Sequence, residues 1–252
     1  MKNQKIITEL FGNDSEFVQD YIGSNKEKQI CKNNHEIYET KFGNVVVKNF
    51  LKETTFNREK QAYNFFLENK LISVPRLYYA ENSTIITDLV HSNKRYNLET
   101  VIDDWAKIHS LTLNNKGDFE IYDSRNVHVP DQIRPKLNLI SLTHGDLYSN
   151  NVLNFNGEHY YIDFETFGLG HPARDLSLLL FNEPNSKEQI IEQYRKKIDF
   201  DYPELVEDIN LLYKIKLRVI IETLKKDTNI PLKFREKFIQ KAENQLKEEN
   251  HS

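Results

Sequence analysis

The stretch THGDLYSNNVLNFNGEHYYIDFE, residues 143–165, decides how the rest of the chain is interpreted. It places Asp146, Asn151 and Asp163 within eighteen residues and contains neither a cysteine nor a serine paired with an obvious base. The Asn-Gly pair at 156–157 lies between two β-type runs, which predicts a hairpin that begins after Asn151 and ends before Asp163. Paired strands return the chain to its starting end, so these two side chains can converge on one ion.

This set of side chains suits one kind of chemistry. Mg²⁺ takes oxygen ligands and usually keeps waters and substrate phosphates in its coordination shell. The protein therefore needs to contribute only a few ligands, and one carboxylate and one carboxamide are sufficient. Asp146 has no partner in the motif that neutralises it, and it can therefore accept a proton or orient a hydroxyl. In phosphoryl transfer to an alcohol the nucleophile belongs to the substrate. The stretch thus predicts Asn151 and Asp163 as metal ligands and Asp146 as the catalytic base.

Four segments carry a resemblance to the aminoglycoside phosphotransferase and choline kinase family, relatives of the protein kinases. HGDLYSNN resembles their catalytic loop, and YYIDFE resembles their metal-binding segment. GHPARDLSLLL resembles the following helix, whose Asp175 is expected to brace the catalytic loop through its backbone, and WAKIHSL resembles another helix of the family. The resemblance implies an α+β, bilobal, protein-kinase-like fold with a small β-rich N-terminal lobe and a larger, mainly helical C-terminal lobe.

The first third of the chain offers the nucleotide-binding parts that such a fold needs. VVVK places Lys48 on a strand, where it is expected to contact the α- and β-phosphates, and strand alternation puts Val46 on the same face, where it can cover an adenine ring. The helix that starts near residue 57 supplies Glu59 to hold Lys48. We expect the backbone from Thr87 to Leu89 to form the hinge that binds adenine.

Hydrophobic periodicity gives a coarse map of the elements. Residues 4–22 are expected to be helical; the following runs predict strands at 28–32, 36–42 and 44–50 with a Gly43-Asn44 turn, one helix, and two more strands, and helices are predicted at 97–113, 174–182, 186–196, 203–227 and 231–249. We place a nucleotide-binding lobe at residues 1–88 and a catalytic and acceptor-binding lobe at residues 89–252.

The sequence departs from the family pattern in three places. No glycine-rich loop is present; the first hairpin turn is KNNHE, where backbone amides and Asn33 or Asn34 are expected to cover the phosphates. The metal segment has Glu165 where protein kinases have glycine. Only eleven residues lead from Asp163 to Arg174, too few for a peptide-docking activation segment, which disfavours a protein kinase.

Composition excludes several other classes. The 252 residues carry a net charge of −4 with both signs mixed along the chain, so no basic stripe indicates nucleic-acid binding. No apolar run approaches the roughly 20 residues of a membrane span. The single cysteine, Cys31, excludes an internal disulfide and fits a reducing compartment, so we expect a cytoplasmic protein. The oligomeric state stays open.

The functional hypothesis is an ATP- and Mg²⁺-dependent phosphotransferase that acts on a hydroxyl of a small molecule, with GTP not excluded as donor. The acceptor is an aminoglycoside-type antibiotic or a choline-like or amino-alcohol metabolite. The acids of IDFDYPELVED, residues 198–208, suit a polycation, but they also fit an ordinary helix start. The alternatives are a non-catalytic nucleotide-binding scaffold, disfavoured by the complete set of five polar residues, and a protein kinase.

Overall fold

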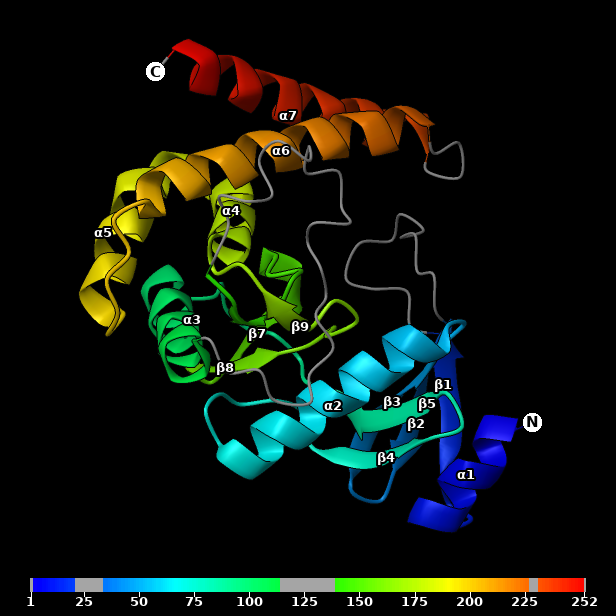
Figure 1. Cartoon of the computed structure of the whole chain (residues 1–252). Helices are drawn as coiled ribbons and strands as arrows, with labels where there is room; N and C mark the ends of the chain where they lie inside the picture. Colours follow the sequence, from blue (N-terminus) through cyan, green and yellow to red (C-terminus); the bar gives the residue numbers. More distant parts are fainter. Residues whose placement is uncertain (1, 21–33, 114–138, 227–230, 252) are drawn as a thin grey trace. The chain divides into compact units, whose positions relative to one another are not determined.

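The computed structural model describes residues 2–20, 34–113, 139–226 and 231–251 (Figure 1). Packing divides the chain into two compact units. The first unit comprises Met1–Arg95 and Leu153–Glu165, and the second comprises Tyr96–Val152 and Thr166–Ser252. The functional division into lobes at residues 1–88 and 89–252 stays a prediction, because packing alone assigns no function.

A five-stranded antiparallel sheet forms the centre of the first unit. Its spatial order is β1-β2-β3-β5-β4. The strands are β1 (Glu16–Asp20), β2 (Asn34–Thr40), β3 (Gly43–Asn49), β4 (Leu77–Glu81) and β5 (Thr84–Asp88). In β3, Val45 and Val47 are buried in an apolar cluster on one face, and alternation therefore puts Val46 and Lys48 on the other face. The central strand thus carries the predicted phosphate-binding lysine on the face opposite this cluster.

Two local predictions in this unit are wrong. The helix α1 spans Lys2–Phe11, but residues 16–20 form β1 and not a helix. The strand forms because β2 satisfies its backbone groups, a tertiary pairing that local periodicity does not reveal. The β2–β3 loop is Lys41 and Phe42, and Gly43 with φ 112° already begins β3. The predicted strand at 28–32, with Cys31 and Asn33, lies outside the described residues.

The helix α2 (Glu53–Asn69) follows β3 and supplies Glu59. Its buried side chains recur every three or four positions, which explains why the segment is helical: Phe56, Glu59, Ala62, Tyr63 and Phe66. The helix ends where Lys70 takes the left-handed conformation with φ 51° and donates its N–H to the Phe66 carbonyl. Glu59 is the one charged member of this buried face, so its carboxylate requires a partner.

The hairpin of the opening stretch forms as predicted. Strands β7 (Val152–Phe155) and β8 (Glu158–Tyr161) flank Asn156 and Gly157, which have φ 54° and 93°. Positive φ at both positions is what a tight two-residue hairpin turn requires, and Asn-Gly tolerates it best.

The second unit is mainly helical. Its helices are α3 (Leu98–Thr112), α4 (Ala173–Asn182), α5 (Lys187–Lys197), α6 (Leu205–Lys226) and α7 (Leu232–His251). The short strands β6 (Ser141–Thr143) and β9 (Gly168–Gly170) pair, and the described part of the unit also has two short 3-10 turns, η3 (Ser149–Asn151) and η4 (Pro184–Ser186). The helix α6 packs against α4 and α7 (Figure 1). The helices predicted from periodicity are confirmed, as is the α+β fold class. Among the described helices, none is apolar over enough of its length to cross a bilayer.

Candidate active site

Lys48 is the centre of a compact charged cluster in the first unit. Its side chain is buried, with the residue 7% exposed. The Lys48 Nζ lies 2.6 Å from Glu59 Oε2, 2.8 Å from Asp163 Oδ1 and 2.9 Å from Glu165 Oε1. Strand β3, helix α2 and the segment after β8 each supply part of the cluster. Residues that are 115 positions apart are therefore joined by a direct hydrogen bond between Lys48 and Asp163.

The cluster has an excess of negative charge. Three carboxylates and one ammonium leave a formal charge of −2. Burial lowers the pKa of Lys48, but the three carboxylates outweigh it and raise that pKa well above its ordinary value. Burial raises the pKa of Glu59 to about 7, against the opposing effect of Lys48. Oxygen atoms of Glu59, Asp163 and Glu165 lie within 4.8 Å of one another, which suits a hard divalent cation.

The backbone around Asp163 is held in an uncommon conformation. Asp163 has φ 65°, in the left-handed region where Asp and Asn are the most tolerated residues after glycine. The next residue, Phe164, is completely buried, and its ring packs against Tyr63 and Phe66 of α2 at centroid distances of 5.7 and 5.4 Å. These aromatic contacts hold the segment in place, so the 41%-exposed Asp163 side chain is available to a ligand.

The predicted adenine-binding residues lie on two neighbouring strands. Val46 of β3 is the cross-strand partner of Thr87 in β5. The Leu89 N–H donates to the Asn44 carbonyl at 2.9 Å, and the Asp88 N–H donates to the Arg76 carbonyl at 3.1 Å. Both backbone donors are thus engaged within the protein. The hinge role of Thr87–Leu89 stays a prediction, and carbonyl oxygens are the backbone groups through which it would act.

In the second unit Asn151 organises the loop around Asp146, which is the predicted catalytic loop. The Asn151 Nδ2 donates to the Asp146 backbone carbonyl at 2.8 Å and to the Asp146 Oδ2 at 3.3 Å. These bonds close the loop around η3 and orient the half-buried Asp146 carboxylate. Because both use the Nδ2 donor, the Asn151 Oδ1 is the atom that would serve a metal ion.

Asp175 braces this loop, as the resemblance implies. Its carboxylate accepts the backbone N–H groups of His144 and Gly145, both at 2.8 Å, and lies 3.4 Å from His109 Nε2. The His109 Nδ1 in turn lies 2.9 Å from the Tyr194 hydroxyl. Burial raises the pKa of Asp175, but His109, the His144 charge and the Gly145 N–H outweigh it and hold that pKa below its ordinary value.

Gly145 is required by both conformation and space. It has φ 77°, and a Cβ at this position would lie 2.4 Å from the Thr166 carbonyl oxygen and 3.0 Å from Arg174 Nη1. A side chain here would displace the backbone next to Asp146. Sequence reasoning gave this glycine, Arg174 and Lys216 of α6 no role. It treated Glu165 only as a departure from the kinase pattern, although a third carboxylate in the metal segment was a signal for a charged cluster.

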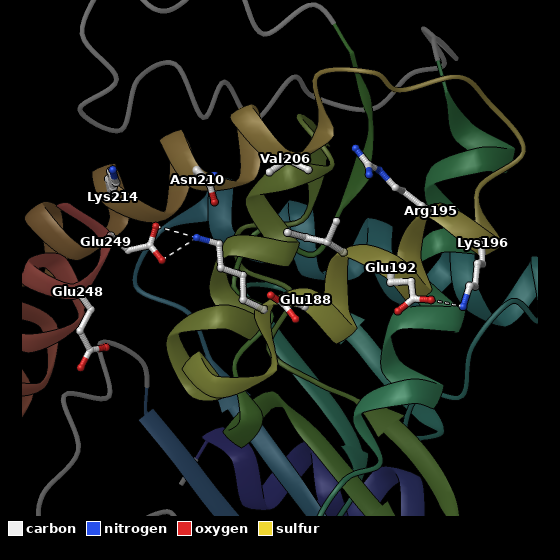
Figure 2. Close-up of a pocket in the computed structure, with 11 residues that line it drawn as sticks. Glu188, Glu192, Arg195, Lys196, Val206, Asn210, Lys214, Glu248 and Glu249 are labelled. Atoms are coloured by element: carbon white, nitrogen blue, oxygen red, sulfur yellow. Dashed lines mark hydrogen bonds and ion pairs between the residues drawn. The ribbon is translucent and has the colours of Figure 1, made fainter. Parts of the chain in front are cut away.

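A surface hollow of about 940 Å³ lies between α5, α6 and α7 (Figure 2). Its walls carry the ion pairs of Lys187 with Glu249 and of Lys196 with Glu192. None of the site residues predicted from the sequence lines it. We assign it no role, since several of its charges compensate one another.

Comparison with known proteins agrees with this geometry. Residues 99–207 match the sequence model of a family described as "Phosphotransferase enzyme family". No curated protein matches the chain. The resemblance stated from the motifs is confirmed for the part of the chain that holds the catalytic loop and its brace.

Solved structures share the fold over nearly the whole chain. An amicoumacin kinase, hAmiN, in complex with AMP-PNP, Ca²⁺ and Ami has 14% identity and a TM-score of 0.66, covering 100% of this chain and 93% of its own. A microcompartment-associated aminopropanol kinase has 13% identity and a TM-score of 0.67, with coverage of 97% and 94%. A choline/ethanolamine kinase family protein from Mesorhizobium loti has 12% identity and a TM-score of 0.63, with coverage of 99% and 93%. The chain therefore resembles phosphotransferases that act on small molecules.

Proposed function

We propose that this chain, which has the fold of small-molecule kinases and matches the phosphotransferase enzyme family over residues 99–207, transfers the γ-phosphate of ATP to a hydroxyl group of a small molecule. The observation that carries the proposal is the buried ion pair of Lys48 and Glu59, with Asp163 2.8 Å from the same ammonium. This arrangement is the one that phosphate binding by a strand lysine requires.

Each residue then has a defined task. Lys48, held by Glu59, would contact the nucleotide phosphates, and Asp163 and Asn151 are the residues that would supply oxygen ligands to Mg²⁺. The ion, when bound, neutralises phosphate charge. Asp146 orients the acceptor hydroxyl. As the acceptor oxygen forms its bond to the γ-phosphorus, the bond from that phosphorus to the β–γ bridging oxygen breaks and the hydroxyl proton moves to Asp146. The Asn151 hydrogen bonds keep the carboxylate in place for this transfer.

Two sequence features favour a small molecule over a protein as acceptor. One is the Asp-Phe-Glu segment at 163–165, and the other is the small number of residues between this segment and α4, which leaves no room for a peptide-docking activation segment. The sequence leaves an antibiotic and a metabolite open as acceptors, and ATP and GTP open as donors. No observation on the described residues favours a scaffold, since Lys48, Glu59 and Asp163 are assembled as a catalytic cluster would be.

The test is phosphoryl transfer from γ-labelled ATP, and separately GTP, to aminoglycosides, choline, ethanolamine, hydroxy acids, hydroxy amino acids and sugars. Transfer should require Mg²⁺, and Asp146→Asn should lower kcat by about 10²–10⁴-fold while nucleotide binding is retained. Tight nucleotide binding with no transfer to any acceptor would support the scaffold and overturn the proposal. Loss of nucleotide binding in Asp146→Asn would remove the assignment of the base.

A further inference from the structure

Helix α6 places a lysine next to the catalytic loop. The Lys216 Nζ lies 5.1 Å from the centroid of the Tyr148 ring, and Tyr148 is two residues from Asp146. Lys216 is half-buried. Among the residues that the structure describes, no carboxylate forms an ion pair with it within 4.0 Å, so the Tyr148 ring is the group that the ammonium contacts.

A second cation, Arg174, lies in the first turn of α4 and reaches the same loop. Its Nη1 lies 3.0 Å from where a Gly145 side chain would begin, directly before Asp146. The electrostatics show that Lys216 senses both groups. Burial lowers the pKa of Lys216 to about 8, the Asp146 carboxylate opposes this, and the Arg174 guanidinium adds to it. The two positive side chains therefore lie at Tyr148 and at Gly145, on either side of Asp146 in the loop sequence.

A third cation extends this surface along an aromatic pair. The Tyr148 and Phe181 rings meet edge to face at 6.0 Å, and the Lys241 Nζ of α7 lies 4.4 Å from the Phe181 centroid. Lys216 and Lys241 thus lie against two neighbouring rings that start at the catalytic loop. Ring faces stabilise such ammonium groups without neutralising them. The Glu183 carboxylate acts on Lys241, so Lys216 is the cation on which the inference rests.

The acidic segment before α6 does not offset these cations. Asp208 is buried and accepts a hydrogen bond from the Tyr202 hydroxyl at 2.9 Å, and its carboxylate lies 3.4 Å from His171 Nε2. The other acids of this segment are exposed: Asp199, Asp201, Glu204 and Glu207. The acid nearest the core is thus engaged within the protein, and the remaining ones match a solvated helix start.

We infer that the acceptor carries an anionic group, a carboxylate or a phosphate, that Lys216 and Arg174 bind while Asp146 engages its hydroxyl. This inference rests on the proposed function and narrows it. A hydroxy acid, a hydroxy amino acid or a phosphorylated sugar fits the requirement, whereas choline or a polycationic aminoglycoside meets like charge beside the base. Like charge at a binding site disfavours the wrong ligand, and attraction favours the right one, so both contribute to specificity.

The experiment compares hydroxyl acceptors that differ in charge: glycerate against choline and ethanolamine, and glucose 6-phosphate against glucose. We expect kcat/KM to be at least about tenfold higher for an anionic member, because a charged hydrogen-bonding partner contributes that much. The first set tests whether the site recognises a carboxylate, and the second tests whether it recognises a phosphate group. Preference for the cationic or neutral members throughout overturns the inference and leaves the proposed function standing.

Variants of Lys216 test whether this lysine causes the preference for anionic acceptors. Lys216→Met should raise the KM for the anionic acceptor about tenfold or more without changing the KM for ATP, and Lys216→Arg should retain most of the affinity because it keeps the charge. Lys214→Met is the matched control, since Lys214 lies on the same helix and lines the hollow of Figure 2. A rise in the KM for ATP in Lys216→Met would assign the lysine to the nucleotide and contradict the inference. Transfer to no acceptor, with Asp146→Asn equal to wild type, would overturn the proposed function and the inference together.

Discussion

The two units each carry a charged cluster, and the two clusters have opposite charge balance. In the first unit one buried lysine is surrounded by three carboxylates at 2.6–2.9 Å. In the second unit the Asp146 carboxylate and the Arg174 guanidinium both act on the charge of Lys216, which lies against the Tyr148 ring. An excess of carboxylates suits a divalent cation, and an excess of ammonium and guanidinium groups suits an anion.

The clusters also differ in how tightly they are held. The Lys48 ammonium has three direct carboxylate partners, so its position is fixed before any ligand binds. Lys216 contacts a ring face, and the Asp146 charge acts on it without a direct ion pair. The first cluster is therefore held in place before any ligand binds, as the proposed phosphate binding needs, whereas the second is expected to take its final arrangement with the acceptor.

The largest effect is expected from a change in the carboxylate-rich cluster of the first unit, which would bind the divalent cation. Asp163→Asn removes one negative charge from the cluster that faces Lys48, and we expect Mg²⁺-dependent nucleotide affinity and turnover to fall together, by about 10³-fold in kcat/KM. Calorimetry of ATP binding with and without Mg²⁺, beside steady-state kinetics, measures this. Glu158→Gln, on the exposed surface of the β7–β8 hairpin, is the control. Unchanged Mg²⁺ dependence in Asp163→Asn would refute the ligand role.

The next effect tests the brace of the second cluster. Asp175→Asn exchanges an oxygen that accepts a backbone N–H for an amide donor, so either His144 or Gly145 loses its acceptor. We expect kcat to fall about 10²-fold with a smaller change in nucleotide affinity, and the free energy of unfolding to fall by about 1–3 kcal/mol. Kinetics and urea denaturation measure the two effects. Asp201→Asn, at an exposed position before α6, should leave both unchanged. Full activity in Asp175→Asn would show that the loop holds its shape alone.

A moderate effect concerns the pH dependence of the first cluster without Mg²⁺. The folded pKa of Glu59 is about 7, above its ordinary value of 4.5, so the folded state binds more protons than the unfolded state between these pH values. The free energy of unfolding should therefore fall as pH rises from about 4.5 to 7, by about 1–3 kcal/mol. Glu59→Gln should remove this slope. Parallel curves for wild type and variant, from denaturation at a series of pH values, would contradict it.

The smallest effect is one of stability in the second cluster. The folded pKa of Lys216 is about 8, below its ordinary value of 10.5, so the charged form costs stability at all pH values below about 8. That cost is relieved as pH rises from 8 toward 10.5. Lys216→Met should thus raise the free energy of unfolding by about 1 kcal/mol at pH 7, which corresponds to a Tm a few degrees higher than that of the wild type. This difference in Tm should disappear near pH 10.5. A lower Tm in the variant would mean that the lysine stabilises the fold and is not kept for a ligand.

Much of the fold followed from local patterns. The helices α3 to α7 and the β7–β8 hairpin were predictable because apolar spacing and an Asn-Gly turn act within a few residues. The strand β1 was not predictable, because its hydrogen bonds come from β2 and not from its own sequence. The candidate site divides in the same way. Lys48, Glu59 and Asp163 each lie in a motif with known spacing. The contact of Glu165 with Lys48 was not predictable, because it depends on where the segment after β8 lies in the folded unit.

The sequence by itself determined the family resemblance and predicted the class of chemistry and the residues that would bind phosphate and metal. These predictions were possible because the residues lie in short segments whose spacing reflects one geometry. Only the tertiary structure brought Lys216 to the Tyr148 ring and Arg174 to Gly145. A lysine on an amphipathic helix has no local signal that separates it from a solvated one, since its burial and its neighbours depend on how α6 packs against the rest of its unit.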